Sequence, residues 1–186
     1  MRIITGKSKG TKLNTLEGQE TRPTAERTKE AVFSTLQFDI EGREVLDLFA
    51  GSGQMGLEAL SRGARSACFV DSSKRAVEII KGNAQKTRLF DDCSIFCDDA
   101  LSFLKKQRDK GFDIVFLDPP YASDLINKAL LLLVENKLVK STSYIVCESD
   151  SFDILSKENL EKYEIVRKMK HGVAHILILK CAEGVL

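Results

Sequence analysis

The strongest chemical signal in the sequence is the quartet Asp118-Pro119-Pro120-Tyr121. It directly follows the mostly apolar run 112–117, which is typical of a buried strand. Proline has no N–H donor and fixes its own backbone torsion, so two prolines end the strand and hold the chain rigid. The Asp118 carboxylate and the Pro119 carbonyl then become fixed acceptors, and Tyr121 offers a ring for stacking. Ligands of open α/β sheets bind at this end of the strands, so two fixed acceptors beside a ring indicate a ligand-binding turn.

A second pattern, G-x-G-x-x-G, is formed by Gly51, Gly53 and Gly56 where a predicted strand turns into a helix. Glycines there let the backbone approach a ligand, and the helix N-terminal amides face it. Asp71 follows Gly51 by twenty residues, at the end of the next predicted strand, where an acid can accept from a ribose diol. A dinucleotide and S-adenosylmethionine both fit this pattern. The Asp47 carboxylate favours the second, because it repels a pyrophosphate and attracts the ammonium group of an amino-acid ligand.

The elements that position these residues follow from the hydrophobic periodicity. Strands are predicted at 45–49, 67–70, 94–97, 112–117, 144–147, 163–169 and 175–179, and helices at 25–36, 55–61, 74–86, 100–107, 125–138 and 152–160. This alternation indicates βαβ units with right-handed crossovers. The last two strands are joined by only a short connection, so they must be antiparallel. We therefore predict an α/β fold with a doubly wound, mainly parallel seven-stranded sheet and an antiparallel C-terminal edge hairpin.

Residues 1–24 differ in character from the rest, and we expect a short basic extension, a β-hairpin leading into a helix, on a single catalytic core at 25–186. In this hairpin the segment 2–4 would pair with 12–13. The formal net charge of the chain is only +1, yet residues 1–29 hold seven basic and three acidic residues, a net of +4 that leaves −3 for the remainder. A basic arm of this kind is suited to binding the phosphates of a nucleic acid. The candidate RNA-binding residues of the arm are Arg2, Lys7, Lys9, Lys12, Arg22 and Arg27.

The composition excludes several classes of protein. Hydrophobic residues make up 43% of the 186 residues, enough for a core, which excludes global disorder. The longest apolar run is six residues, at 129–134, where a membrane span needs about 20. The N-terminus lacks the apolar stretch of a signal peptide. His171 and His175 have no third ligand beside them, so we expect no metal. We expect a cytoplasmic monomer that does not act at a membrane.

The glycine loop resembles motif I of the class I S-adenosylmethionine-dependent methyltransferases, and Val70-Asp71 resembles their motif II. The resemblance implies that the 47–53 loop holds the methionine end of the cofactor and that Asp71 holds the ribose. It also implies that Asp99, or as second choice Asp98, faces the adenine amino group. The quartet at 118–121 is similar to the Asn/Asp-Pro-Pro-Tyr/Phe motif of methyltransferases that act on exocyclic or amide nitrogens. The cofactor-binding residues so implied are Asp47, Phe49, Ala50, Gly51, Ser52, Gly53, Asp71, Ser72, Asp98, Asp99, Ala100 and Asp118.

One family is resembled more closely, the bacterial ribosomal RNA small subunit methyltransferase D family of guanine-N2 methyltransferases. The matching blocks are 2–6, 9–10, 22–24 with Arg27, Glu30 and 33–36, then 47–53, 56–64 and 118–121, and the similarity runs to about residue 180. The resemblance implies methylation of a guanine N2 in small-subunit ribosomal RNA, on an assembled or partly assembled particle. It also suggests that Arg22 and Thr24 lie near the cofactor or the RNA. One departure is His171-Gly172 where a Tyr-Gly pair is often seen, which leaves a base contact from that turn open.

Three other functions remain open. A DNA methyltransferase acting on adenine N6 or cytosine N4 usually carries a separate target-recognition region, for which this chain has little room. A nicotinamide-dependent oxidoreductase would use the glycine loop but would have no use for the Asp118 quartet. A catalytically silent RNA-binding module would keep the basic arm and would lose the cofactor.

Overall fold

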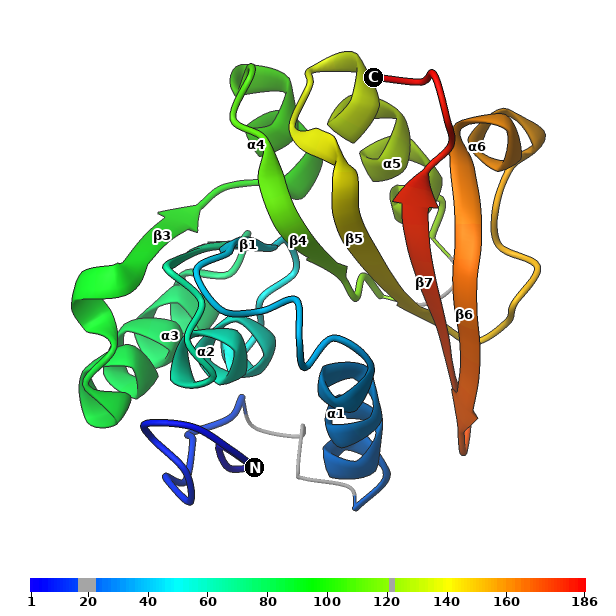
Figure 1. The fold of residues 1–186 in the computed structure, drawn as a ribbon. Coiled ribbons are helices and arrows are strands. Elements are labelled where there is room, and N and C mark those ends of the chain that lie inside the picture. The colour runs from blue at the N-terminus through cyan, green and yellow to red at the C-terminus, as the bar shows by residue number, and fades with distance from the viewer. Residues whose placement is uncertain (17–22, 121–122) are drawn as a thin grey trace.

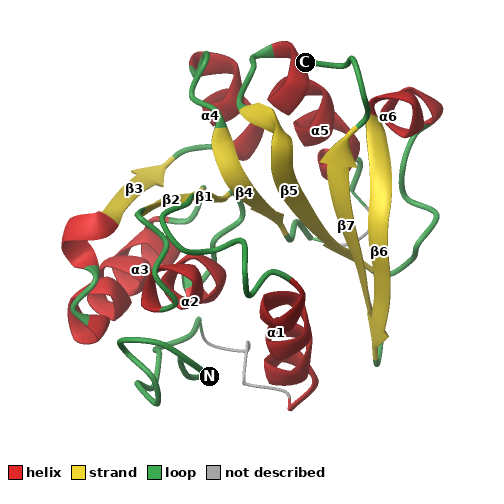
Figure 2. Ribbon diagram, in the orientation of Figure 1, coloured by secondary structure: helices red, strands yellow, loops and turns green. Residues whose placement is uncertain are grey.

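A computed structural model of the chain describes residues 1–16, 23–120 and 123–186, and its centre is a seven-stranded sheet (Figure 1). The strands are β1 Glu44–Asp47, β2 Ser66–Asp71, β3 Cys93–Cys97, β4 Phe112–Leu117, β5 Val139–Ser149, β6 Tyr163–His171 and β7 Ala174–Cys181. The helices are α1 Pro23–Thr35, α2 Gln54–Ser61, α3 Lys74–Thr87, α4 Ala100–Lys106, α5 Leu125–Glu135 and α6 Lys157–Lys162, with a 3-10 turn at Phe90–Asp92. Figure 2 shows helices on both faces of the sheet.

The strand order is β3-β2-β1-β4-β5-β7-β6. Strands β1 to β5 pair in parallel, and β7 runs antiparallel to both β5 and β6. The predicted fold class is therefore confirmed, including the antiparallel hairpin at the C-terminal edge. The order reverses between β1 and β4, and ligands of open α/β sheets bind outside the carboxyl ends of the strands at such a point.

Two elements differ most from the prediction, and α5 ends at Glu135 instead of residue 138. Strand β5 is longer than 144–147, because Val139 pairs with Phe112 of β4 across a register shift and Glu148 and Ser149 continue the pairing with β7. The last helix begins at Lys157 instead of residue 152. The ring of Phe152 packs edge-on against His175 with centroids 4.6 Å apart, and Ser156 caps the helix by accepting from the Asn159 amide. The apolar residues before Ser156 are used for packing in an irregular segment, which the periodicity did not distinguish from a helix.

The N-terminal segment is anchored to α2 through one buried carboxylate. An isolated antiparallel bridge between Arg2 and Lys12 confirms the predicted pairing. The fully buried Glu58 accepts hydrogen bonds from the Ile4 amide at 2.8 Å and the Thr5 amide at 3.1 Å. It also pairs with Lys29 of α1 at 3.5 Å. Glu58 therefore ties the hairpin and α1 to the helix that follows the glycine loop. The longest helix described, α3 with 14 residues, is too short to cross a bilayer.

Candidate active site

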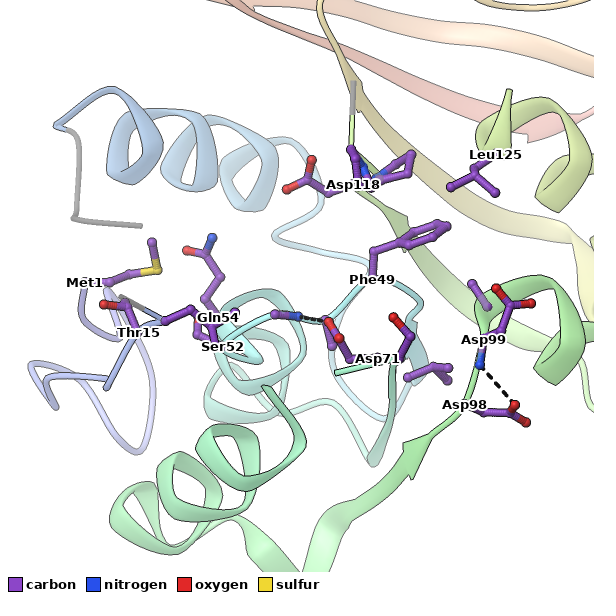
Figure 3. A pocket seen from close by; sticks show the side chains of 18 residues that line it. Met1, Thr15, Phe49, Ser52, Gln54, Asp71, Asp98, Asp99, Asp118 and Leu125 are labelled. Carbon is purple, nitrogen blue, oxygen red and sulfur yellow. Dashed lines mark hydrogen bonds between the residues drawn. The ribbon is translucent and has the colours of Figure 1, made fainter. Parts of the chain in front are cut away.

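The carboxyl ends of the parallel strands surround a cavity of about 620 Å³ (Figure 3). The loop after β1, the ends of β2 and β3 and the turn after β4 all contribute side chains, as the switch point in the strand order requires. The residues lining this cofactor-sized cavity are Met1, Thr15, Leu16, Phe49, Ala50, Gly51, Ser52, Gln54, Val70, Asp71, Ser72, Asp98, Asp99, Ala100, Asp118, Pro119, Pro120 and Leu125. Most of the residues singled out in the sequence are thus brought together.

The conformation of the glycine loop depends on two glycines with left-handed backbone torsion angles and on hydrogen bonds to Asp71. Gly51 has φ of 53° and Gly53 has φ of 75°, in the region where a side chain is strained. The Gly51 amide donates to Asp71 Oδ2 at 2.8 Å, and the Ser73 amide donates to Oδ1 at 2.9 Å. Asp71 therefore shapes the loop in addition to facing the cavity. A substitution of Asp71 would therefore alter the shape of the glycine loop and also remove a carboxylate from the cavity.

Two of the predicted cofactor-binding residues lie behind the cavity wall. Asp47 is 4% exposed, and its Oδ2 accepts from the Gly56 amide at 2.9 Å, in the first turn of α2. Burial, opposed by that hydrogen bond, raises the pKa of Asp47 to about 7. Gly53 is also buried and faces Ile80 and Phe69. Asp47 and Gly53 support the loop from within and are not part of the lining.

The two candidate adenine-facing acids both line the cavity, and each is engaged locally. Asp99 caps α4, because its side chain accepts from the Ser102 amide at 2.8 Å. Asp98 pairs with Lys106 at 2.7 Å, and the hydrogen bond from that ammonium holds the pKa of Asp98 below its usual range. Asp99 is exposed and retains a second carboxylate oxygen, so it stays the first choice for a ligand amino group.

Asp118 directly follows β4 and lines the cavity at the end where the Gln54 side chain also lies. The Asp118 side chain is exposed to water on the side that faces the cavity, and protein atoms enclose it on its other sides. The resulting desolvation, together with the negative charges of Glu148 and Asp47, raises the pKa of Asp118 well above its usual range. Pro119 is buried and Pro120 is exposed, and both line the cavity. Tyr121 lies outside the described residues.

Comparison with known proteins identifies the family. The family model for conserved hypothetical protein 95 matches residues 1–180. A Haemophilus influenzae protein named ribosomal RNA small subunit methyltransferase D is 39% identical over 81% of this chain and 79% of its own length. The chain belongs to the ribosomal RNA small subunit methyltransferase D family. YlbH of Bacillus subtilis, named as a candidate rRNA methyltransferase, is 35% identical over 97% of this chain and 98% of its own. The solved structure of yhhF from Escherichia coli, described as a candidate methyltransferase, has a TM-score of 0.85 at 29% identity, covering 97% of each chain.

Sequence reasoning missed the part of the wall that comes from the N-terminus of this methyltransferase D family member. Met1, Thr15 and Leu16 line the cavity. Asn83, which is fully buried on α3, holds the neighbouring residue Asn14 in place. Its side chain accepts from the Asn14 amide and donates to the Asn14 carbonyl, at 2.8 and 2.9 Å. It also donates to the Ser52 carbonyl of the glycine loop at 2.9 Å. Nothing in the local sequence indicates a contact between residues 69 positions apart.

Gln54 was also missed, although it stands inside the G-x-G-x-x-G pattern and lines the cavity. Its Oε1 atom is buried and accepts no hydrogen bond from any described residue. Of the predicted RNA-binding residues, Arg2, Lys7, Lys9, Lys12 and Arg27 are exposed or partly exposed. Arg22 and the side chain of Thr24 lie outside the described part of the chain. In this family member the basic side chains of residues 2–12 therefore lie on the outer side of the N-terminal segment, and the inner side of that segment lines the cavity.

Proposed function

We propose that this protein transfers a methyl group from S-adenosylmethionine to the exocyclic N2 of a guanine in small-subunit ribosomal RNA. The observation that carries the proposal is the charge of the cavity. Four carboxylates line it, at Asp71, Asp98, Asp99 and Asp118, and no lysine or arginine is found among the described lining residues. A sulfonium and an ammonium group are attracted to such a cavity, whereas a pyrophosphate is repelled. This favours S-adenosylmethionine over a nicotinamide dinucleotide.

The hydrogen-bond acceptors that line the cavity fit this cofactor. Asp71 would accept from the ribose hydroxyls, and Asp99, or alternatively Asp98, from the adenine amino group. Residues 49–52 would hold the methionine end, with Gly53 and Asp47 supporting that loop from behind, Asp47 through the Gly56 amide. When bound, S-adenosylmethionine supplies an electrophilic methyl group on a sulfonium. The remaining steps fall to side chains of this protein.

Asp118 and Pro119 prepare the nucleophile in this mechanism. The Asp118 carboxylate and the Pro119 carbonyl accept hydrogen bonds from the two amino hydrogens of the base. These hydrogen bonds reduce the delocalisation of the nitrogen lone pair into the ring, so the lone pair is available to attack the methyl group. The surplus proton on the methylated nitrogen then passes to Asp118, whose raised pKa suits it as the base. Tyr121 would stack on the target base, a contact worth about 1–3 kcal/mol.

The RNA substrate is supported by relatives and by the arm. The Haemophilus influenzae relative is named for the small-subunit ribosomal RNA, and the Bacillus subtilis relative for ribosomal RNA. The basic residues Arg2, Lys7, Lys9 and Lys12 stand on the segment whose other side lines the cavity. We place residues 1–24 as a phosphate-gripping extension of a core at 25–186, acting as a cytoplasmic monomer on an assembled or partly assembled particle.

The test is methyl transfer from labelled S-adenosylmethionine to undermethylated small subunits, naked ribosomal RNA and DNA in parallel, with the modified base mapped. Asp118→Ala should lower the rate by about 10²–10³-fold and leave the affinity for S-adenosylhomocysteine nearly intact. Asp118→Asn keeps one acceptor and should retain more activity than the alanine variant. Asp91→Ala, at an exposed aspartate in the turn before β3, is the control. Absence of label in guanine N2 with every RNA substrate would refute the proposal.

A further inference from the structure

Three cavities meet at the turn after β4. Besides the cofactor-sized cavity, one of about 110 Å³ lies between α1 and the ends of β4 and β5, and one of about 310 Å³ lies beside the prolines. Asp118 lines the first and second, Pro119 and Pro120 line the first and third, and Glu148 lines the second and third. Glu148 therefore faces two of the three spaces that adjoin the Asp-Pro-Pro turn, one shared with Asp118 and Gln54 and the other with Asp124 and Asp150.

The sheet register places Glu148 beside Asp118. Strands β4 and β5 are parallel, and Leu117 is the partner of Cys147, so the next residues on each strand are neighbours on the same face. Adjacent strands lie about 4.8 Å apart. The electrostatics agree, because the charge of Glu148 is the largest influence on the pKa of Asp118 after desolvation. Glu148 is half-buried, so water screens the pair only in part.

The polar groups that gather here are mainly acceptors. The Gln54 side chain lines the second cavity with the two carboxylates, and its buried Oε1 accepts nothing from the described residues. In Figure 3 the Gln54 amide and the Asp118 carboxylate extend into the space at the same end of the first cavity. Lys29 also lines the second cavity, but its ammonium donates to the Arg2 carbonyl at 2.7 Å and pairs with Glu58. A ligand that presents N–H donors side by side suits the carboxylates and the Gln54 oxygen at this corner.

We propose that Glu148 selects guanine by accepting a hydrogen bond from the ring N1–H while Asp118 accepts from the adjacent amino group. This assignment rests on the proposed function. Guanine carries a ring N–H beside its amino group, whereas adenine and cytosine carry a ring nitrogen lone pair in that place. A carboxylate next to Asp118 therefore attracts guanine and repels the other two amino-bearing bases, which gives discrimination by an unfavourable contact as well as a favourable one.

The test uses 2-aminopurine, which keeps the 2-amino group of guanine but has a lone pair in place of N1–H. Small subunits are reconstituted with either base at the mapped position, and the initial rate of methyl transfer is compared. The wild-type protein should prefer guanine by about 10-fold or more, the size expected of one charge-assisted hydrogen bond. Glu148→Gln should lower the rate on guanine by about 10–100-fold. It should also bring the two bases within about threefold of each other, because an amide can donate to the lone pair as well as accept.

The controls separate this assignment from folding and from the proposed function. Glu161→Gln makes the same change at an exposed residue of α6 and should match the wild type. Glu148→Gln should bind S-adenosylhomocysteine and unfold thermally as the wild type does. Unchanged base preference in Glu148→Gln, with normal guanine methylation by the wild type, overturns the Glu148 assignment alone. Failure of the wild type to methylate any guanine overturns the proposed function together with it.

Discussion

Replacing Glu58 by glutamine should destabilise the fold by about 3–5 kcal/mol, the cost of removing one partner from a buried ion pair. Glu58 and Lys29 are 0% and 1% exposed as side chains, and their charged atoms lie 3.5 Å apart. The Glu58 carboxylate also accepts from two backbone amides of residues 4 and 5 and from Arg62 Nε at 2.8 Å. Glutamine has one acceptor oxygen for these donors, and it leaves the Lys29 ammonium buried beside a neutral group. For a chain of this length each kcal/mol lowers the midpoint by about 2–4 °C, so a loss of about 6–20 °C is expected.

The assay is thermal and urea unfolding of Glu58→Gln, Lys29→Met and the double variant, with Glu78→Gln on the exposed face of α3 as control. The control should stay within about 0.5 kcal/mol of the wild type. The double variant should be less destabilised than the sum of the singles by about 1 kcal/mol or more, because the buried Lys29 charge is then removed together with its partner. Additive single effects, or a loss below about 1 kcal/mol in Glu58→Gln, would refute the reasoning.

The loss of stability in Glu58→Gln should depend on pH in a direction that follows from the pKa of Lys29. Burial lowers the pKa of Lys29 below its ordinary 10.5 even with Glu58 present. Removal of Glu58 lowers the pKa further, so the folded variant gives up its proton at a lower pH than the unfolded chain does. Stability of the variant relative to the wild type should therefore recover as the pH rises from neutral toward 10.5.

Three further outcomes concern the site. Asp71→Ala should weaken S-adenosylhomocysteine binding by about 10–100-fold in calorimetry, since it removes a charged acceptor as well as the hydrogen bonds that shape the glycine loop; unchanged affinity would contradict the ribose assignment. Converting Lys7, Lys9 and Lys12 to glutamine should flatten the slope of log affinity for RNA against log salt by about 0.7 for each single-strand phosphate that these side chains no longer neutralise, and an unaltered slope would place the arm off the RNA. An ordinary carboxyl group ionises at about pH 4. Because the pKa of Asp118 is raised, kcat/KM for S-adenosylmethionine should increase with pH above that range, as Asp118 ionises. The pH profile of Asp118→Asn should lack this increase, and an increase that persists must belong to another group.

The parts of the site that could be predicted are those whose position follows from strand topology. Asp71 is the last residue of β2 and Asp118 directly follows β4, and both strands are parallel neighbours of β1. Their side chains come close together because the carboxyl ends of parallel strands lie at the same edge of the sheet. The prolines and glycines carry backbone constraints that are visible in the sequence. The helix at 152–160 was misplaced because apolar residues that pack in an irregular segment have no periodicity to separate them from a helix.

The rest of the site depends on interactions between distant residues. Thr15 and Leu16 reach the cavity because Asn83 holds Asn14, and Glu148 adjoins Asp118 because of the β4–β5 register. Neither interaction is encoded in a local pattern. The same holds for Asp47, whose type pointed to a ligand contact but whose burial makes it a partner of the Gly56 amide.

The N-terminal segment determines how its own role can be studied. Deleting it to test RNA binding would also open the cavity wall at Met1 and Thr15, expose core around the fully buried Ile3 and strip two hydrogen bonds from Glu58. A truncated protein that fails to methylate would then say nothing about RNA. The protein cannot be truncated at the boundary predicted near residue 24 without damaging the core. Only point substitutions at the exposed lysines can separate the role of the outer surface of the arm from that of its inner side.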